Sequence, residues 1–256
     1  MASYGTVLSL AELSMGSGKQ TEQELRVQLA GTYRLFAHLG WDYLTFGHIT
    51  VALPGPEKHF LINPFGLRFD EVTASNLVKI DAQANIVEPS KYPVNPAGFF
   101  IHSAIHTARE DAVCVMHTHT TAGMAMAAVE TEILPVDFAG SAAHGRIGYH
   151  DFAGVHADES DCAALVSSLG EKNYLMLRNH GILTCGTSIA RAFQRLYWLE
   201  TACKVQTTAL AMNLPIRKVD VEVAAKHAGV LDGDDGELSL AAMLRLMEKI
   251  DPSFRD

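Results

Sequence analysis

Two histidines one residue apart interrupt an apolar run in the segment AVCVMHTHT. In a β-strand, successive side chains point to opposite faces, so His117 and His119 would point the same way and lie close enough to bind one ion. Histidine is the commonest metal ligand in proteins. An isolated H-x-H pair is more often one core and one surface histidine, because short motifs often match by chance. A metal site therefore needs a further ligand from elsewhere in the chain.

The segment RNHG, which follows the apolar run YLML, offers that ligand. His180 would stand on a tight turn, where Gly181 permits a positive φ or a close approach of the backbone. Three imidazoles with an open fourth position are typical of a catalytic metal site, whereas a structural site is closed. The plain alternative for His180 is a turn residue that bonds its own backbone.

Other candidate side chains carry weaker signals. His102 and His106 are four residues apart on a predicted helix, but the glutamate of the H-E-x-x-H motif is missing. His48 stands where a turn enters a strand and would face a pocket. His144 and Tyr149, in HGRIGYHD, would either line a site or be solvated. For each of them a structural role is the more common one. The sequence also lacks G-x-G-x-x-G, Walker and G-x-S-x-G motifs, which argues against a nucleotide cofactor or serine hydrolysis.

Hydrophobic periodicity and turn signals indicate the elements that would position these residues. The mixture of helices, buried strands and hairpins favours one α/β domain with helices packed on a sheet. We predict helices over 21–39, 99–111, 120–130, 158–169, 188–213 and 238–250. We predict strands at TFGHITVAL, HFLINP, LVKID, NIVEP, AVCVMHTH and ILPVDF, and two more around the turn of NYLMLRNHGILTCG. Residues 216–236 are polar and glycine-rich.

Composition excludes several classes of function. The formal net charge is -9 and no Lys/Arg run occurs, so nucleic-acid binding is not expected. The apolar stretches are too short to span a bilayer, and the first residues lack the basic flank of a secretory signal. The four cysteines lie far apart without a C-x-x-C, which fits a reducing cytoplasm.

Several ordered segments together resemble the class II aldolase and adducin head-domain family over roughly residues 21–210. They are TFGHITVALPG, FLINPFGLRFDEVTASNLVKID, NPAGFFIHSAIHTARED, AVCVMHTHT and RNHGILTCGTSIARAFQRLYWLE. The resemblance implies a three-layer α/β/α sandwich with a mixed central sheet. It divides the chain into an N-terminal arm (1–20), the family domain (21–215) and a C-terminal extension with a terminal helix (216–256).

The resemblance also implies a divalent metal on His117, His119 and His180. Zinc is expected first, with Fe(II) or Mn(II) as alternatives. A small-molecule substrate and a homotetramer are expected as well. Two segments depart from the sugar-phosphate aldolases of the family. Their Ser-Ser-Glu-type segment is Pro96-Ala97-Gly98 here, so Gly98 takes the place of the acid/base glutamate. Their Ser/Thr-Gly-Asn turn is Phe46-Gly47-His48, and Gly47, His48 and Gly98 are the substrate-binding positions that the family pattern indicates.

We therefore expect a metal-dependent lyase that breaks a carbon–carbon bond of a hydroxy- or oxo-acid through an enediolate or enolate stabilised by the metal. Decarboxylation needs no base to break its bond, so the loss of the glutamate harms it less than aldol cleavage. His144 is the first candidate for a substitute acid/base, followed by His48 and Tyr149. The alternatives are an inactive binding or assembly protein like the adducin head, and an Fe(II) oxygenase on the same fold.

Overall fold

The computed structural model describes residues 20–154 and 159–256, so the expected N-terminal arm lies almost wholly outside the described residues. A seven-stranded sheet runs through the described chain in the order β3-β2-β1-β4-β7-β6-β5. Only the β5–β6 pair is parallel, which makes the sheet mixed as expected. The strands are β1 (His48–Ala52), β2 (His59–Ile62), β3 (Val78–Asp81), β4 (Cys114–Thr118), β5 (Ile147–His150), β6 (Tyr174–Leu177) and β7 (Gly181–Gly186).

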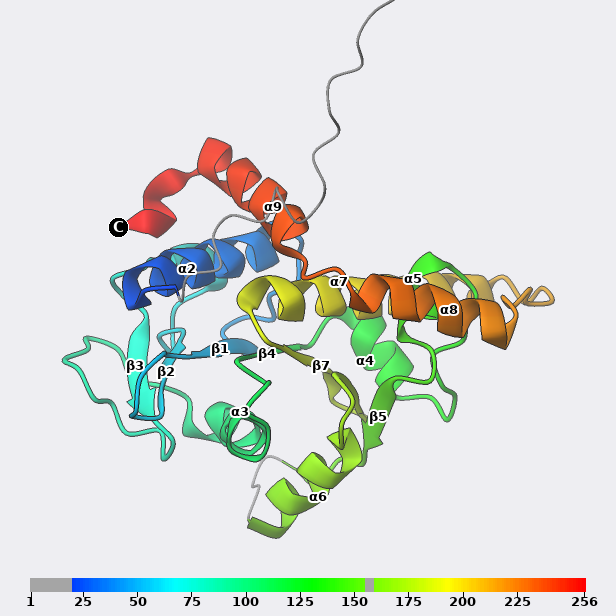
Figure 1. Cartoon of the computed structure of the whole chain (residues 1–256), viewed down its shortest axis with the longest axis horizontal. Coiled ribbons are helices and arrows are strands. Elements are labelled where there is room, and N and C mark those ends of the chain that lie inside the picture. The colour runs from blue at the N-terminus through cyan, green and yellow to red at the C-terminus, as the bar shows by residue number, and fades with distance from the viewer. Residues whose placement is uncertain (1–19, 155–158) are drawn as a thin grey trace, which may run out of the picture.

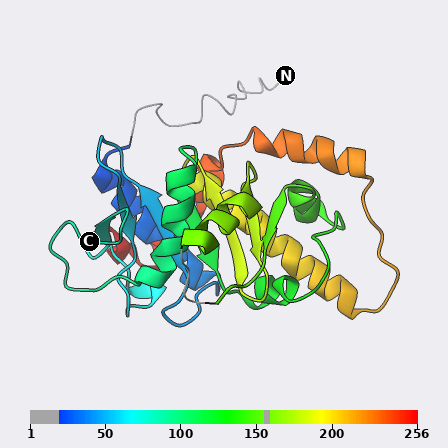
Figure 2. The same cartoon turned by 90° about the horizontal axis from the view of Figure 1, so that it is seen from below.

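Helices cover both faces of this sheet (Figure 1). On one face lie α2 (Glu22–His38) and α7 (Ile189–Ala211), and on the other lie α3 (Pro96–Ala108) and α6 (Glu159–Leu169). Figure 2 shows α3 and α6 from their own side of the sheet. The three-layer α/β/α sandwich is therefore confirmed. The remaining helices are α4 (Thr121–Ala127), α5 (Phe138–Ala143), α8 (Val221–Asp232), α9 (Glu237–Ile250) and the 3-10 turns η1 (Phe69–Glu71) and η2 (Pro252–Arg255).

The helix starts follow capping chemistry. Thr21 and Glu24 form the capping box expected at the start of α2, in which Thr21 accepts the amide of Glu24 and Glu24 reaches back to the Thr21 amide. Ser188 caps α7. Asn95 caps α3, whose first residue is Pro96. These caps set where α3 begins, and this start places Gly98 in its first turn.

Two predicted strands are wrong. NIVEP forms only an isolated bridge between Ile80 and Ile86, because Asp81 accepts the amides of Gln83 and Asn85 and closes a tight turn. ILPVDF is not a strand either, because the side chain of Asp137 caps α5 from within it. Strand β5 and helix α8 were not among the predicted elements.

The expected C-terminal extension packs against the rest of the described chain. Helix α8 lies against α5, while α9 and η2 lie against α2. Arg34 pairs with Asp251 at 2.9 Å, and the amide of Ala74 donates to the Phe254 carbonyl. Within the described residues, no helix is both long enough and apolar enough to cross a membrane.

Candidate metal centre

Strand β4 divides its side chains between the two faces of the sheet. Cys114 and Met116 join the core beneath α2 and α7, whereas Val115 packs in the cluster on the α3 and α6 face. His117 therefore points toward α3 by strand alternation. His117 pairs in register with His48 of the neighbouring strand β1, so the polar positions of both strands meet on one face.

His180 reaches the same place from the turn between β6 and β7. Asn179 takes the positive φ of this turn, at 55°, and its amide donates to the Ala127 carbonyl. Gly181 is needed for close approach instead. A Cβ atom on Gly181 would lie 2.4 Å from the Thr118 carbonyl oxygen and 3.1 Å from His119 Cδ2. The glycine thus lets the turn come against the end of β4.

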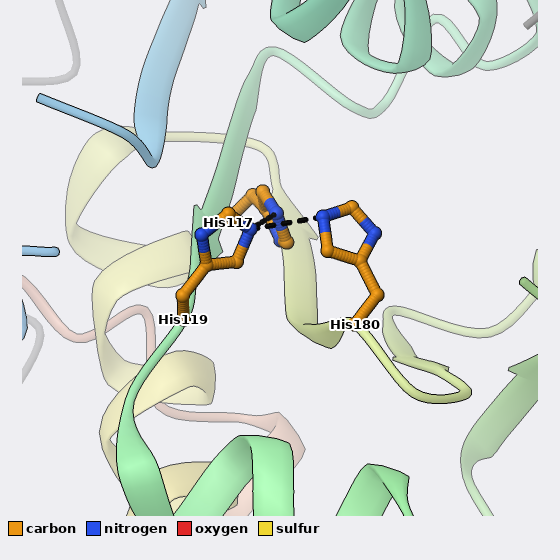
Figure 3. Close-up of side chains that lie close together, drawn as sticks. All are labelled: His117, His119 and His180. Carbon is orange, nitrogen blue, oxygen red and sulfur yellow. Dashed lines mark hydrogen bonds between the residues drawn. The ribbon is translucent and has the colours of Figure 1, made fainter. Parts of the chain in front are cut away.

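The three imidazoles converge on one point through their Nε2 atoms (Figure 3). His117 Nε2 lies 2.7 Å from His119 Nε2, which lies 2.9 Å from His180 Nε2. Possible ligand atoms of His117, His119 and His180 all lie within 4.8 Å of one another, and this set is the only such group of histidine, cysteine and acidic residues in the part of the chain that the structure describes. We call these three residues the histidine trio.

The tautomer of His117 suits a metal ligand. Its Nδ1 lies 2.9 Å from the Ile182 carbonyl oxygen. A carbonyl only accepts hydrogen bonds, so Nδ1 carries the proton in the neutral ring and Nε2 carries the lone pair. A second hydrogen bond of this kind commonly orients a metal-binding histidine. The backbone of β7 therefore directs the lone pair of His117 toward the other two rings.

Burial keeps the trio neutral. Desolvation lowers the pKa of His119 to about 4, lowers that of His180, and lowers that of His117 well below its usual range. The neighbouring imidazoles lower the pKa of His117 and His119 further. Metal binding requires the neutral ring. The trio is therefore in its ligating form at neutral pH without first releasing protons.

The donor set fits a small divalent cation. Zinc binds imidazole nitrogens at about 2.0–2.1 Å, so two ligands of a tetrahedral ion stand roughly 3.3 Å apart. The Nε2 separations of 2.7 and 2.9 Å are a few tenths of an ångström shorter, within reach of small ring rotations. Three neutral nitrogen ligands, from β4, the residue that follows it and the β6–β7 turn, leave a fourth position for a small molecule.

A second set of histidines lies behind the trio. His48 is buried, and its ring centroid lies 4.1 Å from that of His102 and 5.5 Å from that of His117. Thr50 Oγ1 lies 2.7 Å from both His102 Nδ1 and His106 Nε2, and His106 Nδ1 lies 2.6 Å from the Ala112 carbonyl oxygen. The polar face of β1 is thus buried against α3.

The donor and the acceptor of each hydrogen bond in this buried network can be assigned. The Ala112 carbonyl requires a proton on His106 Nδ1, so neutral His106 accepts from the Thr50 hydroxyl through Nε2. Thr50 then accepts from His102 Nδ1. We singled out His48, His102 and His106 from the sequence but did not predict their link through Thr50. The same-face positions of His48 and Thr50 on β1 were the available signal.

Of the substrate-binding positions that the family pattern indicates, Gly47 and His48 lie beside His117, and Gly98 lies beside His48. Gly47 has a φ of 85°, and a Cβ atom there would lie 3.3 Å from the His117 carbonyl oxygen. A Cβ atom on Gly98 would lie 3.0 Å from Cε1 and 3.1 Å from Nδ1 of His48. Gly98, His48 and His117 therefore form a continuous stack of contacts.

The two other acid/base candidates have different neighbours. His144 Nδ1 lies 3.1 Å from the Ile133 carbonyl oxygen, and the Tyr149 hydroxyl accepts the Ile133 amide. The guanidinium of Arg178 stacks on the Tyr149 ring at 4.5 Å. Among the described residues, none of the hydrogen bonds or ring contacts of His144 and Tyr149 reaches the trio. Their catalytic role stays a prediction.

One further residue was missed from the sequence. Glu200 of α7 is buried, and its Oε2 accepts a 2.5 Å hydrogen bond from Thr120 Oγ1. Thr120 follows His119 and also caps α4. Burial raises the pKa of Glu200. Glu200 therefore fixes the segment that carries His119 from the opposite side of the sheet, and the sequence held no signal for this long-range contact.

Comparison with known proteins places the chain in a family. The profile of the Class II Aldolase and Adducin N-terminal domain matches residues 27–207. Alpha-adducin of Rattus norvegicus is 42% identical over 193 residues, which are 74% of this chain and 26% of alpha-adducin. The chain belongs to the class II aldolase and adducin family, as the sequence resemblance implied.

Solved structures agree with this assignment. An aldolase II superfamily protein from Pseudomonas syringae superposes with a TM-score of 0.88 at 41% identity, covering 94% of this chain and 98% of that one. The L-fuculose 1-phosphate aldolase from Glaciozyma antarctica PI12 superposes with a TM-score of 0.86 at 30% identity, covering 97% of this chain and all of that one. The fold is therefore that of class II aldolases along almost the whole chain.

Proposed function

We propose that this protein is a metal-dependent lyase that breaks a carbon–carbon bond of a small hydroxy- or oxo-acid. The convergence of three neutral imidazole nitrogens at the end of β4 is the observation that carries the proposal. When bound, a divalent cation would supply Lewis acidity for the negative charge that develops on the substrate as the bond breaks. Similarity to a solved L-fuculose 1-phosphate aldolase supports carbon–carbon cleavage as the reaction type.

Zinc is the metal that suits the site best. All three ligands are neutral nitrogens, and zinc commonly takes three histidines and one open position in enzymes. Mn(II) prefers oxygen ligands, and the Fe(II) facial triad includes a carboxylate. Within the described residues the ligand group contains no carboxylate. This composition also weighs against an Fe(II) oxygenase.

Other residues of this chain would bind the substrate and transfer protons. Gly47, His48 and Gly98 are the candidate substrate-binding residues, since Gly47 and His48 contact His117 and Gly98 contacts His48. His48 is the acid/base candidate whose ring contacts the trio. His144 and Tyr149, which bond the backbone of Ile133, are the other acid/base candidates. The activity of variants that replace each of them in turn tests that role.

Metal content tests the proposal directly. We expect purified protein to hold about one divalent ion per chain, and His117→Ala to lose it, because a two-histidine site binds divalent ions far more weakly. His144→Ala is the matched control, since it removes a histidine outside the trio. Elemental analysis of all three proteins gives the answer. Equal, negligible metal in wild type and His117→Ala would contradict the metalloenzyme.

A substrate screen then tests the reaction class. We expect turnover with oxo- or hydroxy-acids and none with ketose phosphates, since Gly98 stands where the sugar-phosphate aldolases carry their acid/base glutamate. Rapid cleavage of a ketose phosphate would overturn this part of the proposal.

A binding or assembly protein is the second candidate. The 42% identity to alpha-adducin over most of this chain, together with Gly98, favours it. An intact histidine trio is not required for such a role. A metal-free wild-type protein that turns over none of the screened acids would support this candidate.

We further propose a cytoplasmic homotetramer that acts on a small molecule. Within the described residues Cys114, Cys185 and Cys203 are free, buried thiols, which supports a reducing compartment. Membership of the class II aldolase family supports oligomeric assembly. The order of the oligomer is a proposal that light scattering tests.

A further inference from the structure

The side chain of His48 is buried directly beside the histidine trio. Only 8% of its surface is exposed, and its ring lies between those of His102 and His117. No residue in the described part of the chain makes a hydrogen bond to its Nε2. The ring packs against its neighbours and makes a hydrogen bond with the backbone of Gly98.

Gly98 makes room for that ring. A Cβ atom at this position would lie 3.0, 3.1 and 3.4 Å from Cε1, Nδ1 and Nε2 of His48. Contacts shorter than about 3.4 Å are repulsive between a methyl carbon and a ring. A glutamate on this turn of α3 would need the space that the imidazole takes. Gly98 and His48 are thus coupled, because a side chain at position 98 needs the His48 ring to shift or to be removed.

The charge balance of the site follows from this coupling. The trio supplies three neutral ligands, and the described ligand group contains no carboxylate. A divalent cation held there would keep its full double charge in a partly buried place. Uncompensated charge in such surroundings is costly, so a ligand in the open position gains strongly by bringing negative charge.

We propose that Gly98 and His48 are specificity-determining residues, which leave the charge of the bound cation to be balanced by the carboxylate of an α-hydroxy- or α-oxo-carboxylate substrate. The proposal rests on the proposed function, because it needs a metal on the trio. When a cation is bound, the substrate carboxylate would supply the negative charge that the three imidazoles lack.

The neighbouring pocket fits the rest of such a molecule. It opens beside His180, and its lining combines the apolar side chains of Ile101, Leu165 and Leu177 with the acidic residues Asp151 and Asp161. Arg178 is the only lysine or arginine among its described lining residues, and its guanidinium donates to the Val129 carbonyl. This lining suits a short apolar substituent better than a phosphate group, which proteins usually hold with several donors.

Glycolate and glycolamide test the proposal, because they share a shape and differ in charge. Protein loaded with Co²⁺ would be titrated with each, and the visible absorption of the cobalt would report binding. We expect glycolate to bind roughly tenfold more tightly or better, because only glycolate compensates the cation's charge. Equal affinities in loaded wild-type protein would overturn the inference and leave the metal site standing.

A pair of double variants tests the roles of the two residues. In His48→Ala/Gly98→Glu the new carboxylate has space and supplies charge, so we expect the preference for glycolate to fall severalfold. In His48→Ala/Gly98→Gln the same space holds a neutral group, and the preference should stay near that of wild type. Equal preferences in the two variants would overturn the inference. Wild-type protein that gives no cobalt spectrum at all would instead overturn the proposed function and the inference with it.

Discussion

At the scale of single residues, Gly181 shows how one missing side chain permits the site. We expect Gly181→Ala to lower the free energy of unfolding by about 1–3 kcal/mol, because the new Cβ would press on the Thr118 carbonyl at 2.4 Å. It should also weaken metal binding, since His119 is displaced with that strand end. Urea unfolding and metal titration measure the two effects.

Gly229→Ala is the matched control for this prediction. A Cβ atom there meets nothing within 4 Å, and the residue lies inside α8. Alanine is the better helix former, so stability should rise by up to about 1 kcal/mol. A Gly181→Ala protein as stable as wild type would show that the turn can shift without cost.

Some contacts of the candidate site could be predicted from the sequence, and others could not. Strand alternation indicated that His117 and His119 share a face, and the NHG turn offered His180, so the trio was predicted as a candidate site beside the ordinary structural roles of these histidines. The coupling of Gly98 to His48 was not. It depends on how α3 lies across β1, and no local signal encodes that packing.

At the scale of elements, one hydroxyl joins β1 to α3. Thr50 Oγ1 bonds both His102 and His106, so Thr50→Val leaves two buried ring nitrogens without a partner. We expect a loss of about 2–4 kcal/mol in the free energy of unfolding, since each unpaired buried group costs about 1–3 kcal/mol. Urea unfolding of the metal-free protein measures it.

Thr184→Val controls for the loss of a buried hydroxyl in the same sheet. Thr184 is equally buried, but it makes one hydrogen bond, to the Ala192 carbonyl. The loss there should be about 1 kcal/mol. Equal losses for the two variants would show that the two imidazoles find other partners.

Elements with strong periodicity were predicted, and those set by tertiary contacts were not. The helices α2, α7 and α9 carry caps or apolar stripes that are visible in the sequence. ILPVDF has strand composition, yet Asp137 within it caps α5. Strand β5 is a short edge strand whose pairing with β6 alone defines it. Local pattern competes poorly with such long-range pairing.

At the scale of the whole molecule, buried neutral histidines make stability depend on pH. Burial lowers the pKa of His106 from 6.5 to about 4 and that of His48 to about 3. As pH falls below 6.5, these histidines become protonated in the unfolded chain but stay neutral in the folded chain. Stability is therefore complete above about pH 6.5 and declines as pH falls toward 4, by up to about 1.4 kcal/mol per pH unit for each such histidine.

Urea midpoints of the chelator-treated protein at pH 7.5 and 5.5 check this prediction. His106→Gln should reduce the pH dependence of the free energy of unfolding by the contribution of this one histidine, because glutamine does not titrate. A wild-type protein equally stable at both pH values would contradict the burial of these rings.

Exposed apolar side chains lie near the trio on the surface of the molecule. We call Tyr43, Leu44, Phe46 and Phe152 the apolar rim. Leu44 is 73% exposed in the loop before β1, and its neighbours Tyr43 and Phe46 are about half exposed. The Tyr43 ring lies 5.5 Å from that of His119. Across the trio, the exposed Phe152 contacts His180 at 5.7 Å. Clustered apolar side chains of this kind mark interaction surfaces, and a second copy of the chain is the partner that the proposed oligomer provides.

If the proposed oligomer forms through this rim, we expect Leu44→Asp to convert it to smaller species, because a buried unpaired carboxylate is costly at an interface. Leu44 has a φ of 55°, and aspartate tolerates this conformation better than leucine, so the change adds no backbone strain. Pro56→Asp, in the exposed β1–β2 turn, is the control and should leave the assembly intact. Light scattering at micromolar concentration distinguishes the outcomes. An unchanged mass for Leu44→Asp would place the subunit contact elsewhere, and the rim would then be the free entrance by which substrate reaches the trio.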